Sequence, residues 1–144
     1  MRGYGMFFGG LILAQGLAAA DLSGIWIGQI PGRRGSTDIS FQFVQQGAQL
    51  SGKLYEDIGS SPFTEGAIDG DHLSFVVVAR EQAGNQVNLV TYRYQGTLID
   101  GELELTREPT KAVDAVSGAE FPVKNWRDDD EQREPPKFRL KRLL

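Results

Sequence analysis

The chain has 144 residues, of which 24% are charged, and 15 Lys and Arg stand against 19 Asp and Glu, for a net charge of −4 at pH 7. An acidic chain of this kind is not expected to bind nucleic acid or an anionic membrane surface. It contains no cysteine, which excludes thiol chemistry and disulfides, and its length suits one domain with a hydrophobic core of its own.

The first 20 residues are typical of a signal peptide for export. Arg2 provides a short positive region, residues 6–17 are mainly apolar, and Ala18 and Ala20 supply the small residues of a cleavage site. The alternative is a membrane anchor, but a spanning helix needs about 20 apolar residues and this run is only about a dozen long. We therefore predict cleavage after Ala20 and a mature protein that is periplasmic or secreted, without stable insertion in a membrane.

The sequence from residue 21 to residue 144 predicts a single all-β domain. Apolar and polar residues alternate there with period two, and Gly, Asp, Asn and Ser separate the runs. Strands are expected at residues 22–30, 37–46, 48–58, 64–69, 72–80, 86–98, 102–107 and 137–143. Eight successive strands leave two exposed edges unless the sheet closes or packs as two sheets. We predict closure into an eight-stranded antiparallel up-and-down β-barrel.

The same alternation predicts which side chains face the barrel interior. These are Trp26, Ile39, Phe41, Phe43, Leu50, Leu54, Leu73, Phe75, Val77, Val90, Tyr92, Tyr94, Leu98, Leu103, Leu105, Phe138 and Leu140. The residues predicted to face outward are Ser40, Gln42, Lys53, His72, Ser74, Glu102, Glu104, Arg139 and Lys141. Four apolar residues, Ile25, Ile27, Val76 and Val78, are also expected on the outside, where exposed hydrophobic side chains usually meet a partner or a covering segment.

Three short stretches resemble the calycins, the group that includes lipocalins, fatty-acid-binding proteins and avidins. The stretch "SGIWIGQI" resembles their Gly-x-Trp first strand, "GAQLSGKLYE" is similar to the second hairpin of avidin-like barrels, and "FRLKR" resembles the closing strand of small exported bacterial barrels. In lipocalins the tryptophan lies at the closed base of the barrel with a basic residue stacked over it. The resemblance implies these roles for Trp26 and for Arg139 or Arg142.

The chain also departs from the avidin pattern. Gly28 stands where avidins have a ligand-binding asparagine two residues after the tryptophan, and the later tryptophans of the biotin pocket are missing. Biotin is therefore not the expected ligand.

The calycin resemblance implies a cup for a small ligand inside the barrel. Phenol groups on an otherwise apolar wall suit a small, largely apolar molecule that is held by a few polar contacts. The alternative is that the same aromatic side chains fill a narrow barrel and leave no cavity. The residues predicted to bind the ligand are Trp26, Phe41, Phe43, Phe75, Tyr92, Tyr94 and Trp126.

Residues 108–136 are predicted to form a long connection, which in a barrel of tight turns is typical of a lid, a binding loop or a disordered segment. A helical turn is expected at Ala112 to Val116, ended by Gly118. Phe121 and Trp126 could cover the barrel mouth, meet a partner, or anchor the loop on the outside of the barrel. The acidic run 128–131 lacks the ligand spacing of a calcium loop and is interpreted as solvated charge.

No constellation of residues indicates an enzyme, a cofactor or a metal site. His72 is the only histidine and is expected at a turn, and no spacing selects a catalytic acid pair from Glu56, Asp57, Asp69 and Asp71. The predicted function is therefore an exported, non-enzymatic barrel that binds a small apolar ligand. The alternative is a protein-interaction module of the cell envelope with a filled core, whose partner would be another exported protein.

Overall fold

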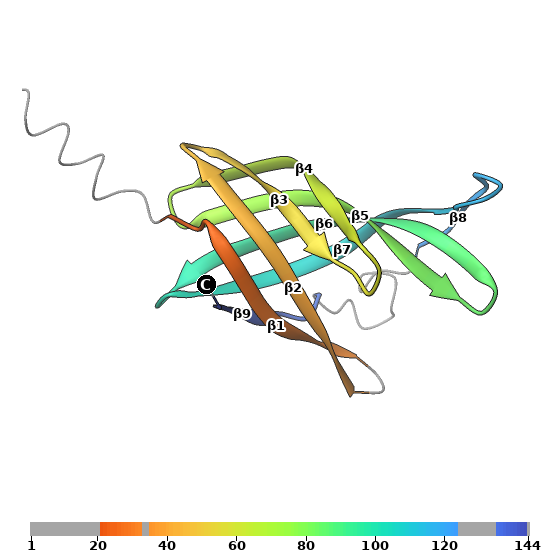
Figure 1. Cartoon of the computed structure of the whole chain (residues 1–144), viewed down its shortest axis with the longest axis horizontal. Coiled ribbons are helices and arrows are strands. Elements are labelled where there is room, and N and C mark those ends of the chain that lie inside the picture. The colour runs from red at the N-terminus through yellow and green to blue at the C-terminus, as the bar shows by residue number, and fades with distance from the viewer. Residues whose placement is uncertain (1–20, 33–34, 124–134, 144) are drawn as a thin grey trace, which may run out of the picture.

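A computed structural model describes residues 21–32, 35–123 and 135–143, and this part of the chain contains strands and turns but no helix (Figure 1). It therefore contains no helix that could cross a membrane. The strands are β1 (Gly24–Gly32), β2 (Gly35–Gln46), β3 (Gln49–Tyr55), β4 (Ser60–Asp69), β5 (His72–Ala83), β6 (Gln86–Ile99), β7 (Glu102–Asp114), β8 (Glu120–Phe121) and β9 (Phe138–Arg142).

The strands form a closed antiparallel barrel, as the sequence predicts. Strands β1 to β7 pair in chain order, β7 also pairs with β9, and β9 pairs with β1. Eight strands thus close the sheet, and β8 is a two-residue addition to the outer end of β7. The up-and-down order follows from the tight turns, because Gly47, Gly70, Gly84 and Gly101 adopt the positive φ that such turns require.

All eight predicted strands are present, but the end of β7 was predicted too early. Residues 108–114 continue β7 and pair with residues 88–93 of β6. The helical turn predicted at Ala112 to Val116 is therefore wrong, since Ala112 and Val113 lie in the strand. The chain turns at residues 115–117, and Gly118 follows with a φ of 76° and donates its N–H to the Asp114 carbonyl.

The predicted interior residues form the core. All of them are buried except Leu98, which is partly buried against the core, and none of the polar residues predicted to face outward is buried. Leu22, Phe63 and Ile68 join them, although the sequence pattern did not assign these three to the interior. Period-two alternation therefore predicted most of the core of this barrel.

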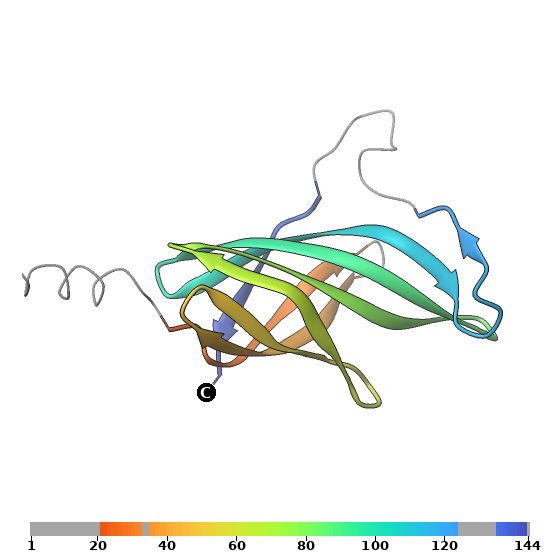
Figure 2. The same ribbon diagram turned by 90° about the horizontal axis from the view of Figure 1, so that it is seen from above.

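The two ends of the barrel differ in length and shape. We call the end with the β2–β3, β4–β5 and β6–β7 turns the Trp26 end. The opposite end, which we call the Tyr92 end, is extended, because β5, β6 and β7 have 12, 14 and 13 residues and project beyond the other strands (Figure 2). Between Gly28 of β1 and Leu140 of β9 the barrel wall closes tightly: a Cβ on Gly28 would lie 2.2 Å from the Arg139 carbonyl oxygen.

Candidate functional site

A cationic side chain closes the Trp26 end. The Arg142 guanidinium lies over the Trp26 ring, 4.7 Å from its centroid, and donates hydrogen bonds to the backbone carbonyls of Asp21 and Ser23. The Trp26 indole N–H donates to the Leu22 carbonyl. The expected basic residue over Trp26 is therefore Arg142. Arg139 lies outside, where it forms ion pairs with Glu102 and Glu104, each at 3.3 Å.

Most of the residues predicted to bind a ligand pack against one another in the middle of the barrel. Trp26, Phe41, Phe43, Phe75 and Tyr94 are at most 1% exposed. Their rings and that of Phe63 meet at centroid distances between 4.3 and 6.4 Å, in stacked, tilted and edge-to-face arrangements. Close packing of this kind leaves the aromatic centre as core, so the space for a ligand must be sought nearer the Tyr92 end.

Polar side chains point inward where the aromatic core ends. The Tyr92 hydroxyl donates a 2.5 Å hydrogen bond to Glu81 Oε2, and the Arg107 guanidinium stacks on the Tyr92 ring at 4.3 Å. Arg107 is opposite Tyr94 in the pairing of β6 with β7. We call Glu81, Tyr92, Tyr94 and Arg107 the Arg107 cluster.

The Tyr94 hydroxyl is the unusual group of the Arg107 cluster. It is fully buried, and among the described residues no group forms a well-aligned hydrogen bond with it. Burial raises the pKa of Tyr94, and the nearby charge of Arg107 only partly opposes this effect. Burial likewise raises the pKa of Tyr92. Both phenols are therefore neutral at physiological pH, and Tyr94 can donate a hydrogen bond to an added acceptor.

Arg107 has no ion pair with any carboxylate of the described residues. The polar groups that act on Arg107 are the hydroxyls of Tyr94 and Tyr92 and the Glu81 carboxylate. A half-buried guanidinium beside a phenol that has no well-aligned hydrogen bond can bind an oxygen atom of a ligand, either a carbonyl or an acidic group.

The barrel wall has a seam near this cluster. The pairing of β4 with β5 ends at Phe63 and Val77, and beyond it Glu56 bridges the two strands. One Glu56 carboxylate oxygen accepts from the Ser61 hydroxyl at 2.9 Å and the other accepts from the Arg80 backbone N–H at 2.8 Å. A pocket of about 290 Å³ lies at this seam and is lined by Glu56, Asp57, Ile58, Arg80, Gln82 and Val87.

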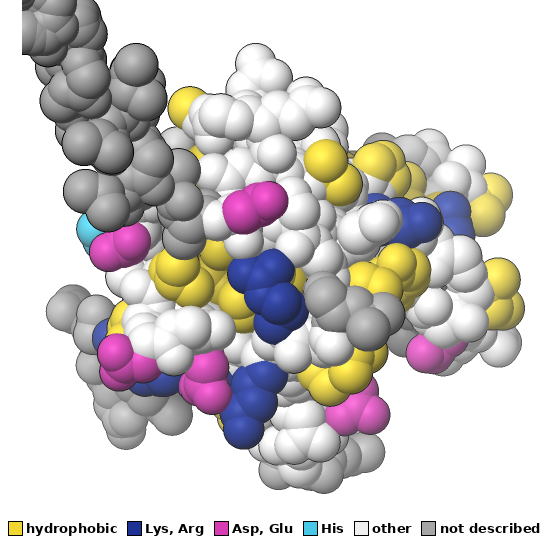
Figure 3. All heavy atoms as spheres, turned by 60° about the vertical axis from the view of Figure 1, so that its left-hand side comes forward, with side chains coloured by type: hydrophobic (Ala, Val, Ile, Leu, Met, Phe, Trp, Pro, Cys, Tyr) yellow, Lys and Arg dark blue, Asp and Glu magenta, His cyan; other side chains and the backbone are white. Residues whose placement is uncertain are grey.

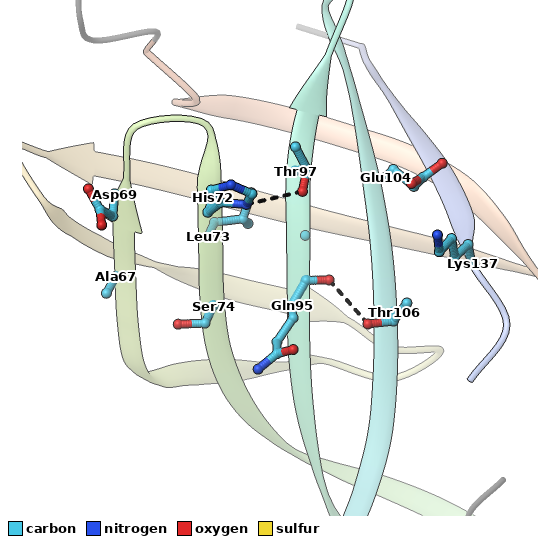
Figure 4. A pocket seen from close by; sticks show the side chains of 11 residues that line it. Ala67, Asp69, His72, Leu73, Ser74, Gln95, Thr97, Glu104, Thr106 and Lys137 are labelled. Atoms are coloured by element: carbon cyan, nitrogen blue, oxygen red, sulfur yellow. Dashed lines mark hydrogen bonds between the residues drawn. The ribbon is translucent and has the colours of Figure 1, made fainter. Parts of the chain in front are cut away.

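A larger pocket lies on the outer face of β4 to β7. Figure 4 shows its polar side chains projecting to one side of the four strands, with the pocket bounded on the β9 side by Lys137. Its volume is about 460 Å³. The described residues that line it are Ala67, Asp69, His72, Leu73, Ser74, Gln95, Gly96, Thr97, Glu104, Thr106 and Lys137.

The outward apolar residues are only partly exposed. Ile27 and Val78 are 41% and 44% exposed, Ile25 is half-buried, and Val76 is buried, which contradicts its predicted exposure. On the face seen in Figure 3, hydrophobic side chains occur in small groups that charged and other side chains separate. This face therefore has no single broad apolar surface.

Several predictions lie outside the described residues, among them the signal peptide, Trp126 and the acidic run 128–131. Phe121 is described and packs against the core from β8. Among the described residues, no group of three or more His, Cys, Asp or Glu could hold a metal ion.

Arg107 and Glu81 were not predicted from the sequence as site residues. Both continue an alternation that was already visible: Arg107 follows Leu103 and Leu105, and Glu81 follows Val77 and Ala79. Extending each pattern by one or two residues would have predicted both side chains to face inward.

Comparison of the chain with family models, with curated proteins and with solved structures found no match. The calycin resemblance therefore stays a prediction, and function has to be argued from the site itself.

Proposed function

We propose that this protein is an exported binding barrel that holds a small, largely apolar molecule at its Tyr92 end, with an oxygen-bearing group of the ligand bound by Arg107 and Tyr94. The observation that carries the proposal is the Tyr94 hydroxyl, which is fully buried, forms no well-aligned hydrogen bond with any described residue and lies next to the Arg107 guanidinium. Leaving such a group unsatisfied costs about 1–3 kcal/mol, so buried hydroxyls normally bond to protein, to ordered water or to a ligand.

The position of the Arg107 cluster limits the ligand. The aromatic core fills the barrel between this cluster and Trp26, so the ligand body would lie on the outer side of Tyr92, toward the extended parts of β5, β6 and β7. Apolar side chains of that region, Ala79, Val90 and Ala112, are buried against the core. A small amphipathic molecule fits this combination better than a long chain that needs a deep cavity.

The proposal can be tested with two fluorescent probes that share one aromatic body. The first is 1-anilinonaphthalene-8-sulfonate and the second is N-phenyl-1-naphthylamine, which lacks the sulfonate. Arg107→Met should lower the affinity for the sulfonate probe about tenfold or more, because it deletes charge-assisted hydrogen bonds. The affinity for the neutral probe should stay unchanged. Arg139→Met removes an outside cation and serves as the matched control, with no change expected for either probe.

Tyr94→Phe tests the hydroxyl alone. It should lower the affinity for a ligand that accepts a hydrogen bond from Tyr94 about two- to tenfold. The fold should persist, since only one oxygen atom is lost. If neither probe binds, and native mass spectrometry of the purified protein finds no retained small molecule, the binding-barrel proposal is wrong.

The protein-interaction module is the second candidate, and the exposure of Ile27 and Val78 is the observation that favours it. Ile27→Ser and Val78→Ser would then abolish co-purification of an exported partner protein. If these variants change nothing while the probes bind as proposed, the interaction module is excluded in favour of the binding barrel.

A further inference from the structure

We propose that the outer pocket on β4 to β7 is a second binding site, and that it takes a neutral carbohydrate chain. The pocket lies on the outer side of the barrel wall, because its polar lining residues on β4 to β7 alternate with the interior residues of the same strands. This inference does not depend on the proposed ligand of the barrel interior.

The sheet register arranges the polar side chains of the pocket in two rows that run across the strands. Paired positions give the first row, Asp69, His72, Thr97 and Glu104. The second row, formed in the same way, is Ala67, Ser74, Gln95 and Thr106. Neighbouring strands lie about 4.8 Å apart and alternate residues about 6.8 Å apart, so these groups form a grid of regular spacing. A ligand with hydroxyl groups along its length could meet several members at once.

The chemistry of the grid indicates a neutral, hydroxyl-rich ligand. The side chains of Asp69, Ser74 and Gln95 form no hydrogen bond with any described residue, so their polar atoms are available. Carboxylate, hydroxyl and amide groups together both accept and donate hydrogen bonds, as a sugar does. An apolar ligand would find only Ala67 and Leu73 as apolar side chains in the lining.

The charges of the pocket disfavour a highly charged ligand. Glu104 is paired with Arg139, and Lys137 lies on the same side of the pocket, while Asp69 lies at the opposite edge (Figure 4). The charges of these four residues balance. A polyanion would meet Asp69 and Glu104, and a polycation would meet Lys137.

The floor of the pocket is formed by closely packed, paired strands. A Cβ on Gly96 would lie 2.2 Å from Leu105 Cδ2 and 2.9 Å from the Glu104 carbonyl oxygen, so β6 approaches β7 closely here. Across the floor, His72 Nδ1 lies 3.3 Å from the Thr97 hydroxyl, and the Thr106 hydroxyl donates to the Gln95 carbonyl at 3.5 Å. Strand pairing fixes the backbone positions of these residues before binding, which lowers the entropy that binding must overcome.

The experiment is an NMR titration of the ¹⁵N-labelled full mature chain with maltohexaose, cellohexaose and chitotetraose. A site of exposed hydrogen bonds without an aromatic platform should bind one of them with a Kd on the order of 1 mM. Saturable shifts are expected at the Gln95 side-chain amide and at the backbone amides of Gly96, Thr97 and Thr106. Glycerol at equal hydroxyl concentration controls for general polyol effects and should give no saturable shift.

Two variants assign the binding to the pocket. Gln95→Ala combined with Ser74→Ala should lower the affinity for the sugar at least fivefold. Gln42→Ala, on the outer face of β2, should leave that affinity unchanged. Both variants should bind the naphthalene probes as the unmodified protein does. The carbohydrate site can therefore be disproved without any consequence for the proposed function of the barrel interior. No saturable shift with any of the three sugars at about 20 mM, or equal binding by the double variant, would overturn the carbohydrate site.

Discussion

The Trp26 end and the Tyr92 end of the barrel use the same combination of an arginine stacked on an aromatic ring, but with different consequences. Arg142 covers Trp26, and its guanidinium is bonded to two backbone carbonyls while the indole N–H also has an acceptor. Arg107 covers Tyr92, yet it has no ion pair among the described carboxylates, and the Tyr94 hydroxyl beside it forms no well-aligned hydrogen bond. The first end is complete in itself, and the second leaves hydrogen-bonding capacity for another molecule.

With the ligand bound as we propose, stability and binding depend on opposite ends of the barrel. Satisfied donors next to a packed aromatic core make the Trp26 end a structural base. Unsatisfied groups that persist in a fold are expected where a ligand or ordered water completes them. Substitutions at the two ends should therefore affect different measurements.

The largest effect on stability is expected from Trp26→Ala. Trp26 is fully buried and contacts Phe43 edge to face, so the substitution should lower the free energy of unfolding by about 3–5 kcal/mol. Chemical denaturation measures this directly. A nearly unchanged midpoint would contradict the structural role of the Trp26 end.

A smaller loss is expected from Arg142→Met, which keeps much of the side-chain volume but deletes the cation–π contact and two hydrogen bonds to carbonyls. We expect a loss of about 2 kcal/mol. Arg107→Met, the matched change at the other end, should lower the free energy of unfolding by less than Arg142→Met does. Its main effect should be weaker binding of the anionic probe. Equal losses of stability in the two variants would remove the distinction between the ends.

High pH should weaken the Tyr92 end in particular. The pKa values of Tyr92 and Tyr94 are raised in the folded protein, so folding stability is intact below their ordinary pKa of 10.0 and falls as pH rises above it, where the unfolded chain loses protons that the folded chain retains. The loss should reach about 1.4 kcal/mol for each tyrosine at pH 11. Urea unfolding between pH 8 and pH 11 should show a shallower dependence for Tyr92→Phe than for the unmodified protein.

The smallest effect should come from Glu56→Gln at the seam between β4 and β5. The amide can still accept one of the two hydrogen bonds from Ser61 and Arg80, so the expected loss is about 1 kcal/mol. Hydrogen exchange of the Arg80 amide should become faster while amides near Trp26 keep their protection. Uniformly faster exchange would show that the seam does not open independently of the rest of the barrel.

Much of this architecture could be predicted from the sequence because a barrel has a simple periodicity. In β2, the residues Ile39, Phe41 and Phe43 alternate with polar ones, and this alternation predicts directly which face of the strand is buried. The end of β7 was harder, because Pro109 and the charged residues around it are typical of a loop. Here a register shift at Thr91 and Tyr92 accommodates the strand, and this depends on its neighbour β6.

The candidate site was predicted only in part, because alternation predicts to which side of the sheet a side chain points but not which residues it contacts. Tyr92 and Tyr94 were predicted as polar groups of the interior. The pairing of three strands determines that Tyr92 bonds to Glu81 while Tyr94 lies beside Arg107 without a well-aligned hydrogen bond. Similarly, Arg142 and Arg139 could not be distinguished until the register of β9 against β1 placed Arg142 opposite Trp26.

The pairing of β9 with β1 also has a consequence for how the chain folds. Arg142 bonds to Ser23 across 119 positions of sequence, so the contacts that close the barrel join two distant segments and are formed at a high cost in chain entropy. Until β9 docks, the edges of β1 and β7 remain open to pairing with other chains. A side chain at Gly28 would collide with Arg139 and Leu140. Substitution of Gly28 should therefore slow the docking of β9 and increase aggregation during folding, even where the folded protein still binds its ligand.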